Sequence, residues 1–254
     1  MKFRRALAGV VAGVFAAALA ANTAADPAPH DPPVLTLIMD DLGYDAALAR
    51  RTLALPRPFA VAILPDSPLA RAVHDDASAH DIDVLLHLPM DAGAPPRTND
   101  TVIAAAMTES EMREGVRAAL ERVPRAIGVN NHEGSVLTAD GDSMAIVMDE
   151  LRHHHDGLIF VDSRTNPDTV AEEMAHEVGL PTTSRDVFLD HDPAAEAVDR
   201  AVDLWLATAR RTGCSLAIGH PREATLSVLE RRMPRLAGEF ELVDLRTYIE
   251  RCAD

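Results

Sequence analysis

The sequence is poor in lysine, cysteine and aromatic residues, and the shortages of cysteine and of aromatic residues each argue against a class of protein. Lys2 is the single lysine and every other basic residue is an arginine, which is typical of adaptation to salt or of a GC-rich genome. Two cysteines are too few for a disulfide framework. Aromatic residues make up 4% of the chain, which argues against an extended groove of rings that stack on sugars.

Basic charge is also scarce, whereas apolar residues are plentiful. Acidic residues outnumber basic ones by 40 to 24, so the net charge of −16 has the wrong sign for a general nucleic-acid binder. Hydrophobic residues make up 47% of the 254 residues, which excludes a disordered chain and allows a large core.

The first 25 residues have the pattern of a secretory signal peptide. Three basic residues within 1–5 precede an apolar run at 6–20 that ends in small residues. An uncleaved membrane anchor is the alternative, but the run is shorter than the ~20 apolar residues of a spanning helix. We therefore expect a cleaved signal peptide at 1–25, a linker at 26–33, and a periplasmic or secreted protein with no stable membrane span.

Short apolar runs alternate with amphipathic stretches along the rest of the chain. The apolar runs lack polar alternation, as do strands that are buried on both faces of a parallel sheet. We expect strands at 34–39, 59–64, 84–88, 127–129, 158–161, 186–189, 216–219 and 240–245. We expect helices at 45–55, 68–80, 109–123, 143–154, 169–178, 194–212 and 223–233.

This alternation predicts an α/β fold with right-handed crossovers and a parallel sheet. Seven to eight strands in one domain, residues 34–254, favour a closed or nearly closed parallel (β/α) barrel, and an open doubly wound sheet is the alternative. Cys214 and Cys252 either pair in the oxidising compartment or remain two separate buried thiols.

Carboxylate or imidazole side chains stand at or just after the ends of nearly all these strands. In a parallel barrel the carboxyl ends of the strands open onto one face, where the active site lies. We therefore expect the following residues to meet at one rim: Asp40, Asp41, His87, His132, Asp162, Asp186, Asp190 and His220.

The residue types at this rim suit metal-assisted hydrolysis. One carboxylate with two imidazoles is a common ligand set for a divalent metal such as zinc, which lowers the pKa of a water molecule towards ~7. A second carboxylate can then accept a proton, and a further histidine can donate one to a leaving group. The rim supplies one residue for each of these roles among Asp40, Asp41, His87, His132 and His220.

Each of these residues also has a purely structural interpretation. Asp41 could cap the following helix, and a histidine that ends a strand often packs through hydrogen bonds alone. The segments 130–134 and 162–165 could be a polar turn and a helix cap. Taken together, these structural interpretations are less convincing than the functional one, because all of them would have to hold at the same rim.

Other histidines are expected to have no role in the site. The run His153–His155 ends a helix, where cations are favoured and solvent is near. We expect the remaining histidines at the surface, including His74, His80, His176 and His191.

Ordered motifs along the chain resemble those of the divergent polysaccharide deacetylase family. The first is Leu-Ile-Met-Asp-Asp-Leu-Gly-Tyr at 37–44, and the further motifs lie at 62–65, 85–90, 128–135, 160–165, 185–190 and 217–221. The resemblance implies a distorted (β/α) barrel of the NodB-like type, in bacterial proteins that are secreted or associated with the envelope.

The resemblance also implies roles that the wider deacetylase superfamily assigns. Asp40 matches its base and Asp41 a metal ligand. His87 matches the first histidine of the second motif, and His220 matches the late histidine that protonates the leaving amine. In such enzymes, water activated by the metal attacks the acetamide carbonyl of an N-acetylated sugar, and acetate leaves.

Two departures from the superfamily pattern change the expected site. Asp91 stands where the second motif carries another histidine, so we expect His132 to complete the ligand set, with Asp91 as the fallback. The arginine-proline-tyrosine motif is replaced by 130–135, so other groups must orient the substrate. We expect these to be Asn131, Asp162, Arg164 and Asp186, which contact the substrate or support the ligands.

Three functions are compatible with these residues. The first is a metal-dependent hydrolase, with Zn²⁺ as the expected ion, that removes acetyl groups from peptidoglycan or another N-acetylated polysaccharide. The second is a metal-dependent hydrolase that acts on another bond. The third is a non-catalytic envelope protein that uses the same fold to bind glycan or a protein partner. The presence of both Asp40 and His220 favours the hydrolases. Cobalt, nickel and manganese also tolerate such ligands.

Overall fold

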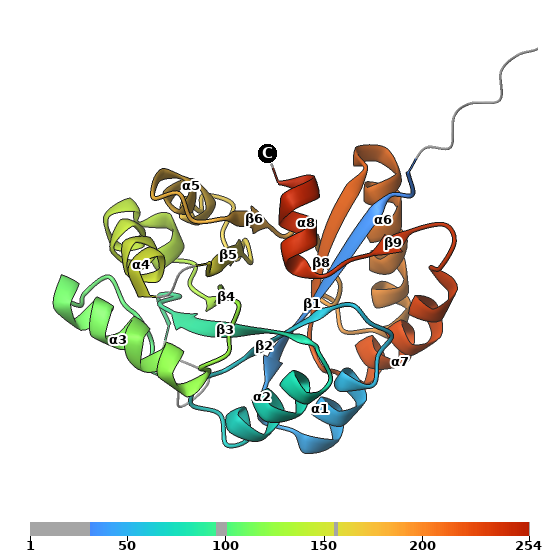
Figure 1. Cartoon of the computed structure of the whole chain (residues 1–254), viewed down its shortest axis with the longest axis horizontal. Helices are drawn as coiled ribbons and strands as arrows, with labels where there is room; N and C mark the ends of the chain where they lie inside the picture. Colours follow the sequence, from blue (N-terminus) through green and yellow to red (C-terminus); the bar gives the residue numbers. More distant parts are fainter. Residues whose placement is uncertain (1–30, 95–100, 155–156, 254) are drawn as a thin grey trace, which may run out of the picture. The chain divides into compact units, whose positions relative to one another are not determined.

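Nine parallel strands form one sheet in this computed structural model, which describes residues 31–94, 101–154 and 157–253 (Figure 1). Eight of them follow the order β6-β5-β4-β3-β2-β1-β8-β7, and β9 pairs with the start of β1. The strands are β1 (Val34–Leu42), β2 (Ala60–Ile63), β3 (Asp83–Met90), β4 (Gly128–Glu133), β5 (Ile159–Asp162), β6 (Thr182–Ser184), β7 (Val187–Phe188), β8 (Cys214–Gly219) and β9 (Glu241–Leu242).

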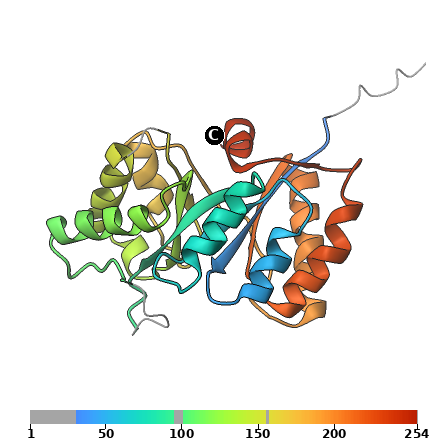
Figure 2. The same cartoon turned by 60° about the horizontal axis from the view of Figure 1, so that its bottom comes forward.

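Helices cover the outer side of the curled sheet, and one further helix lies on its inner side (Figures 1 and 2). The outer helices are α1 (Ala46–Leu53), α2 (Ala70–Ala79), α3 (Glu109–Arg122), α4 (Gly141–His154), α5 (Ala171–Glu177), α6 (Ala195–Thr212) and α7 (Glu223–Arg232). Single turns of 3₁₀ helix occur at Leu137–Ala139 and Met233–Arg235. The inner helix is α8 (Leu245–Cys252). None of the described helices is both long enough and apolar enough to cross a membrane.

The expected α/β class and parallel barrel are confirmed, with one opening. The two ends of the strand path, β6 and β7, do not pair with each other within the described residues, so the sheet is a curled, distorted barrel. The strand expected at 186–189 is present as the short β7, and the short strand β6, which precedes it at Thr182–Ser184, was not expected. The final helix α8 was not expected at all. The predicted signal peptide, 1–25, lies outside the described residues.

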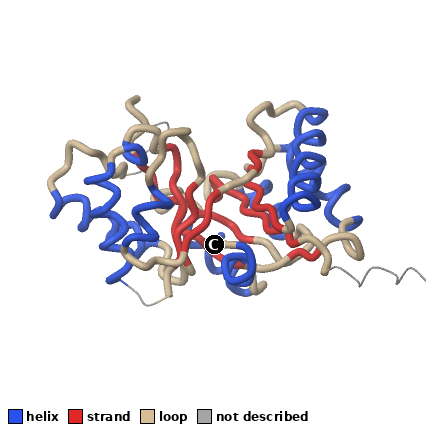
Figure 3. Tube along the Cα trace, turned by 90° about the horizontal axis from the view of Figure 1, so that it is seen from above, coloured by secondary structure: helices blue, strands red, loops and turns tan. Residues whose placement is uncertain are grey.

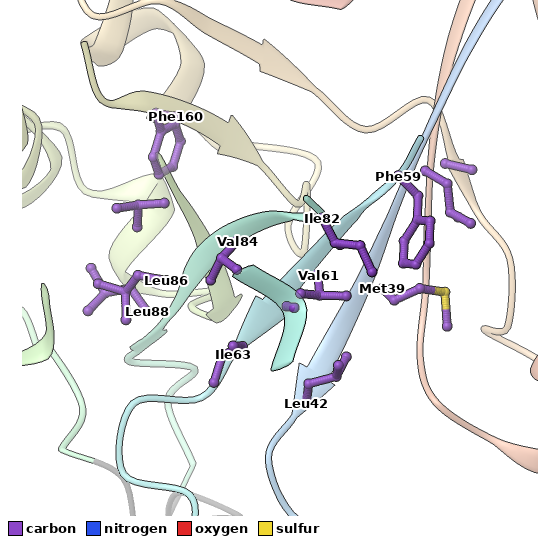
Figure 4. Packing of buried hydrophobic residues seen from close by; sticks show 14 of the residues in the cluster. Met39, Leu42, Phe59, Val61, Ile63, Ile82, Val84, Leu86, Leu88 and Phe160 are labelled. Carbon is purple, nitrogen blue, oxygen red and sulfur yellow. The ribbon is translucent and has the colours of Figure 1, made fainter. Parts of the chain in front are cut away.

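Side chains on each strand alternate between two cores, because successive residues of a strand point to opposite faces. On β1, Leu35, Leu37 and Met39 belong to the outer core beneath the helices, whereas Val34 and Ile38 belong to the inner core of the barrel. Figure 4 shows part of the outer core. This alternation decides which polar residues reach the interior.

Helix α8 closes the inner core at the end where the strands begin. Leu245 and Tyr248 of α8 pack into that core, and the backbone nitrogen of Leu245 donates to Asp83 at the start of β3. Cys252 forms a disulfide with Cys214, the first residue of β8, so the two cysteines do pair. Figure 3 shows α8 between the two flanks of helices, beside the strands. The carboxyl ends of the strands therefore remain for the site.

Contacts and exposure in the structure test the expectations for Asp41, His74 and His153. The N-cap of α1 is Asp45, whose carboxylate accepts hydrogen bonds from the backbone of Ala47 and Leu48, so Asp41 does not cap this helix. His74 is 1% exposed and accepts a hydrogen bond from the backbone nitrogen of Arg125, so the expectation that it lies at the surface is wrong. His153, by contrast, is exposed in the last turn of α4, as expected.

Candidate active site

Asp40 and Asp41 end β1, and they reach the interior for different reasons. Asp40 continues the inward series of Val34 and Ile38, and its side chain is buried. Asp41 would point outward by the same alternation. Its φ of 58° lies in the left-handed region, and the pairing register of β1 with β2 shifts between Met39 and Leu42. This irregular backbone turns two consecutive carboxylates towards one cavity, and strain of this kind is concentrated at functional sites.

Three side chains from three strands place their ligand atoms in a small triangle. Oδ1 of Asp41 is 3.2 Å from Nε2 of His87 and 3.0 Å from Nδ1 of His132. The two imidazole nitrogens are 3.1 Å apart. Pro89 of β3 pairs with His132 of the adjacent strand β4 in the parallel register. His87 lies two residues before Pro89 on β3, so His87 and His132 are diagonal neighbours on adjacent strands.

This triangle fits a divalent metal. Tetrahedral zinc with bonds of about 2.0–2.1 Å separates its ligand atoms by about 3.3–3.4 Å, close to the sides of the triangle. Within the described residues, Oδ1 of Asp41 is buried and has no hydrogen-bond partner, as expected of an oxygen kept for an ion. Asp91, the fallback ligand, instead accepts a hydrogen bond from the backbone nitrogen of Gly93. The ligand atoms of Asp41, His87 and His132 therefore lie close enough together to hold a metal ion.

The buried amide of Asn130 joins the ligand His87 to Asp40. Nδ1 of His87 donates to Oδ1 of Asn130 at 2.9 Å, so in the neutral ring Nε2 is the nitrogen that can bind a metal. The amide nitrogen of Asn130 donates to Oδ1 of Asp40 at 2.8 Å and to the hydroxyl of Ser163 at 3.2 Å. Sequence reasoning missed Asn130, although it lies on β4 two residues before His132, on the same inward face.

His220 is oriented by Asp190, which follows β7. Nδ1 of His220 donates to Oδ1 of Asp190 at 2.8 Å, and its backbone nitrogen and the hydroxyl of Thr225 donate to Oδ2. Nε2 of His220 consequently faces the cavity and lies 3.6 Å from Oδ2 of Asp41. The sequence marked Asp190 as a rim residue but gave it no role.

The charges in this cluster shift one another's pKa values. Burial raises the pKa of Asp40, against the opposing effect of His87 and His220. Burial would also raise the pKa of Asp41, but His132 and His87 outweigh burial and hold that pKa well below its usual range. Burial would lower the pKa of His87, but the carboxylates of Asp40 and Asp41 raise it to about 9. The pKa of His220 is raised, because Asp190 outweighs the burial that would lower it.

The three ligand residues, Asp40 and the pair of Asp190 and His220 line one cavity of about 680 Å³, a size typical of small-ligand sites. Asn131 and Arg164 also line it, as expected. Asn131 accepts a hydrogen bond from the backbone nitrogen of Ser163 and so fixes the loop after β5. A smaller, mostly apolar pocket of about 280 Å³ adjoins Asp41 and His220, with Leu42, Leu48 and Leu64 in its lining.

Two expected site residues do not reach the cavity. Asp162 shares the outward face of β5 with Phe160, and its carboxylate accepts hydrogen bonds from the backbone of Arg164 and the hydroxyl of Thr169. It therefore shapes the loop that carries Arg164. Asp186 is exposed and accepts hydrogen bonds from the backbone nitrogen of Leu216 and from Tyr248 of α8. Its side chain thus lies against β8 and α8 rather than in the cavity.

Several known proteins resemble this chain in sequence or in structure. An uncharacterized protein of Haemophilus influenzae is 35% identical over 211 residues, which are 83% of this chain and 75% of that protein. The uncharacterized protein YibQ of Escherichia coli is 37% identical over 214 residues, which are 82% of this chain and 65% of YibQ, so the chain spans slightly less than two thirds of YibQ. The crystal structure of an uncharacterized protein from Agrobacterium tumefaciens has the same fold, with a TM-score of 0.79 at 18% identity over 87% of this chain and 91% of that one.

A family model extends the agreement to nearly the whole domain. The model of the divergent polysaccharide deacetylases matches residues 37–249, which include at least part of every strand and all but the last turn of α8. With the two relatives above 30% identity, this match settles the family. The chain belongs to the divergent polysaccharide deacetylase family.

Proposed function

We propose that the protein is a metal-dependent hydrolase that removes acetyl groups from an N-acetylated glycan of the cell envelope or the extracellular space. The observation that carries the proposal is the triangle of Asp41, His87 and His132 beside Asp40 and the Asp190–His220 pair. The family's match over residues 37–249 supports a glycan as the substrate.

The ligand triangle would hold a divalent ion, for which Zn²⁺ is the best fit to one carboxylate and two imidazoles. When bound, such an ion polarises a carbonyl oxygen and lowers the pKa of a water molecule towards ~7. Residues of the chain orient the ligands and move the protons. Asn130 holds His87 in the tautomer whose Nε2 can act as a ligand.

Two groups are placed to move protons during hydrolysis of the amide. Asp40, whose pKa is raised by burial, accepts the proton of the attacking water. His220, in its protonated form, donates a proton from Nε2 to the amine nitrogen as the bond from carbon to nitrogen breaks. Asp190 stabilises that protonated imidazole and keeps Nε2 turned towards the cavity. One water molecule is consumed, and the products are acetate and a free amino sugar. Asp40 gains one proton and His220 gives one, so the two groups return to their starting states by exchanging protons with each other or with solvent.

We further propose that the protein works in the periplasm or outside the cell. The basic start and apolar run of residues 1–25 support export, and the disulfide between Cys214 and Cys252 suits an oxidising compartment.

The proposal is tested by metal content and acetate release. Purified protein should hold about one divalent ion per chain and should release acetate from N-acetylglucosamine oligomers or peptidoglycan. Asp40→Asn should keep the ion and lose acetate release, because Asp40 is not in the ligand triangle. If the metal-loaded protein releases no more acetate than Asp40→Asn on any N-acetylated glycan, the proposed activity is wrong, and a glycan-binding role takes its place.

A further inference from the structure

One positively charged side chain on the cavity wall has no negatively charged partner within the described residues. Arg185, between β6 and β7, is half-buried and lines the same cavity as the ligand triangle. Its Nε donates to the carbonyl oxygen of Ser163 at 2.8 Å, and Nη2 donates to that of Arg164 at 2.9 Å. Its guanidinium lies 5.0 Å from the centre of the Phe188 ring. Among the arginine–carboxylate ion pairs of 4.0 Å or less in the described parts of the chain, none involves Arg185.

This lack of a counter-charge distinguishes Arg185 from other arginines that are largely shielded from solvent. The side chains of Arg113 and Arg232 are 25% and 20% exposed, and both contact carboxylates within 3 Å. The chain has 40 acidic residues, so carboxylate partners for shielded arginines are plentiful. A guanidinium stays charged at neutral pH, and its burial without a carboxylate in direct contact is unfavourable. Asp40, Asp162 and Asp186 act on Arg185 only from beyond ion-pair distance. The two carbonyl oxygens hold the group in place but do not neutralise it.

The contacts of Arg185 leave part of its planar guanidinium for a ligand. Nη1 makes no hydrogen bond within the described residues, whereas Nε and one proton of Nη2 are occupied. Arg164 lines the same cavity, and its guanidinium reaches only the hydroxyl of Ser184, at 3.5 Å, among the described side chains. Two arginines without carboxylate partners in the described structure therefore lie next to each other on a wall that the ligand triangle shares.

We propose that Arg185, with Arg164 beside it, binds a carboxylate on the glycan, so that the substrate is an N-acetylated glycan that contains a sugar acid. The proposal rests on the proposed function in taking a glycan as the ligand. A guanidinium matches a carboxylate in shape and charge. A phosphate, with more than one negative charge, is disfavoured because Asp40, Glu133 and Asp190 line the same cavity.

The test compares three sugars that differ in one substituent. The metal-loaded protein is titrated with N-acetylglucosamine, with N-acetylmuramic acid, which adds a carboxylate, and with N-acetylglucosamine 6-phosphate, and binding is followed by NMR. The carboxylate sugar should bind about tenfold or more tightly than the neutral sugar, and also more tightly than the phosphate sugar. Arg185→Gln should abolish this preference, and Arg185→Lys should retain part of it.

A charge-matched control separates a local effect from the change in net charge. Arg211 is exposed in the last turn of α6 and lines neither pocket, so Arg211→Gln should keep the full preference. In the unaltered protein, raising the salt concentration should weaken binding of the carboxylate sugar and leave the neutral sugar unaffected. This measurement tests the proposal even if Arg185→Gln fails to fold.

Three results would overturn the carboxylate site. They are equal binding of the neutral and carboxylate sugars, a preference that survives Arg185→Gln, and tighter binding of the phosphate sugar. Acetate release from neutral oligomers is measured separately. Acetate release without a preference for the carboxylate sugar rejects this site and keeps the proposed function. A preference for the carboxylate sugar without acetate release from any sugar keeps this site and rejects the proposed function.

Discussion

The side-chain amide of Asn130 is hydrogen-bonded to the imidazole of His87, with Oδ1 and Nδ1 2.9 Å apart. This bond keeps a proton of His87 on Nδ1 and turns Nε2 towards Asp41, so Nε2 is the nitrogen available to a metal once the ring is neutral. The other end of the same amide donates to Asp40, so one residue orients both a ligand and the proposed base. Asn130 is 0% exposed, and it therefore acts on the site from behind the cavity wall.

Replacement of Asn130 should weaken the metal site without removing a ligand. We expect Asn130→Ala to lower metal affinity by about 10–100-fold, because loss of a hydrogen-bonded support of a ligand histidine has effects of this size. Competition with a chelator measures the affinity. The neighbouring variant Asn131→Ala removes an identical amide that contacts no ligand, and it should leave the metal affinity within about threefold. Equal losses in both variants would contradict the role of Asn130.

The identity of the third ligand can be tested with a second pair of variants. His132→Ala should remove most of the bound metal, because Nδ1 of His132 is one corner of the triangle. Asp91→Ala should retain it, since Asp91 is engaged with its own loop. Elemental analysis after gel filtration measures both. Full metal occupancy in His132→Ala would show that the ligand set is wrong.

Asp190 should be needed for turnover but not for metal. Asp190→Asn keeps the shape of the buried side chain but loses the charge that stabilises protonated His220, so we expect acetate release to fall by about 10²–10⁴-fold. Metal content should not change. Asp186→Asn makes the same chemical change at a carboxylate outside the cavity and should retain activity. An active Asp190→Asn enzyme would exclude His220 as an acid that depends on this pair.

The rim could be predicted from the sequence because parallel strands bring their carboxyl ends together wherever they lie in the chain. Asp40, His87, His132 and His220 were placed by this rule alone. The rule does not say which way a side chain points, and Asp162 was misplaced because it shares the outward face of Phe160. Asp41 points into the barrel, against the alternation of inward and outward side chains, only because its φ is positive. Neither the amino-acid composition nor the hydrophobic periodicity of the sequence indicates that φ value.

Other features depend on contacts between residues far apart in sequence. Asn130 and Asp190 are ordinary polar residues until their partners, His87 and His220, are known. The eight residues of α8 are too short a stretch to separate from the preceding strand by period. Pairing of Cys214 with Cys252 likewise required the position of α8 against β8.

The disulfide should contribute much of the stability of the closed end of the barrel. It links positions 38 residues apart and ties α8 to β8, so its removal should lower the free energy of unfolding by about 2–4 kcal/mol. Urea denaturation of a Cys214→Ser, Cys252→Ser double variant measures the loss. Reductant should destabilise the unaltered protein by a similar amount and should not affect the double variant. Sensitivity of the double variant to reductant would mean that the effect does not come from this bond.

The N-cap of α8 should make this helix sensitive to acid. Oδ1 of Asp244 accepts a hydrogen bond from the backbone nitrogen of Thr247, and Oδ2 accepts one from its hydroxyl. Burial would raise the pKa of Asp244, but these hydrogen bonds outweigh it and lower the pKa below the ordinary value of 3.8. A carboxylate with a lowered pKa stabilises the folded state fully above its unfolded pKa, and this contribution is lost as the pH falls towards the folded pKa.

Asp244→Ala should therefore cost about 1 kcal/mol at pH 7, and the difference from the unaltered protein should shrink below about pH 4. Urea denaturation at pH 7 and pH 3 measures it. Asp83, whose pKa burial raises, titrates nearby in all variants, so only differences between variants are compared. Asp244→Asn can cap the helix through its amide oxygen but does not titrate, so its advantage over Asp244→Ala should be the same at both pH values. If the unaltered protein keeps its full advantage at pH 3, the ionised cap does not hold α8 in place.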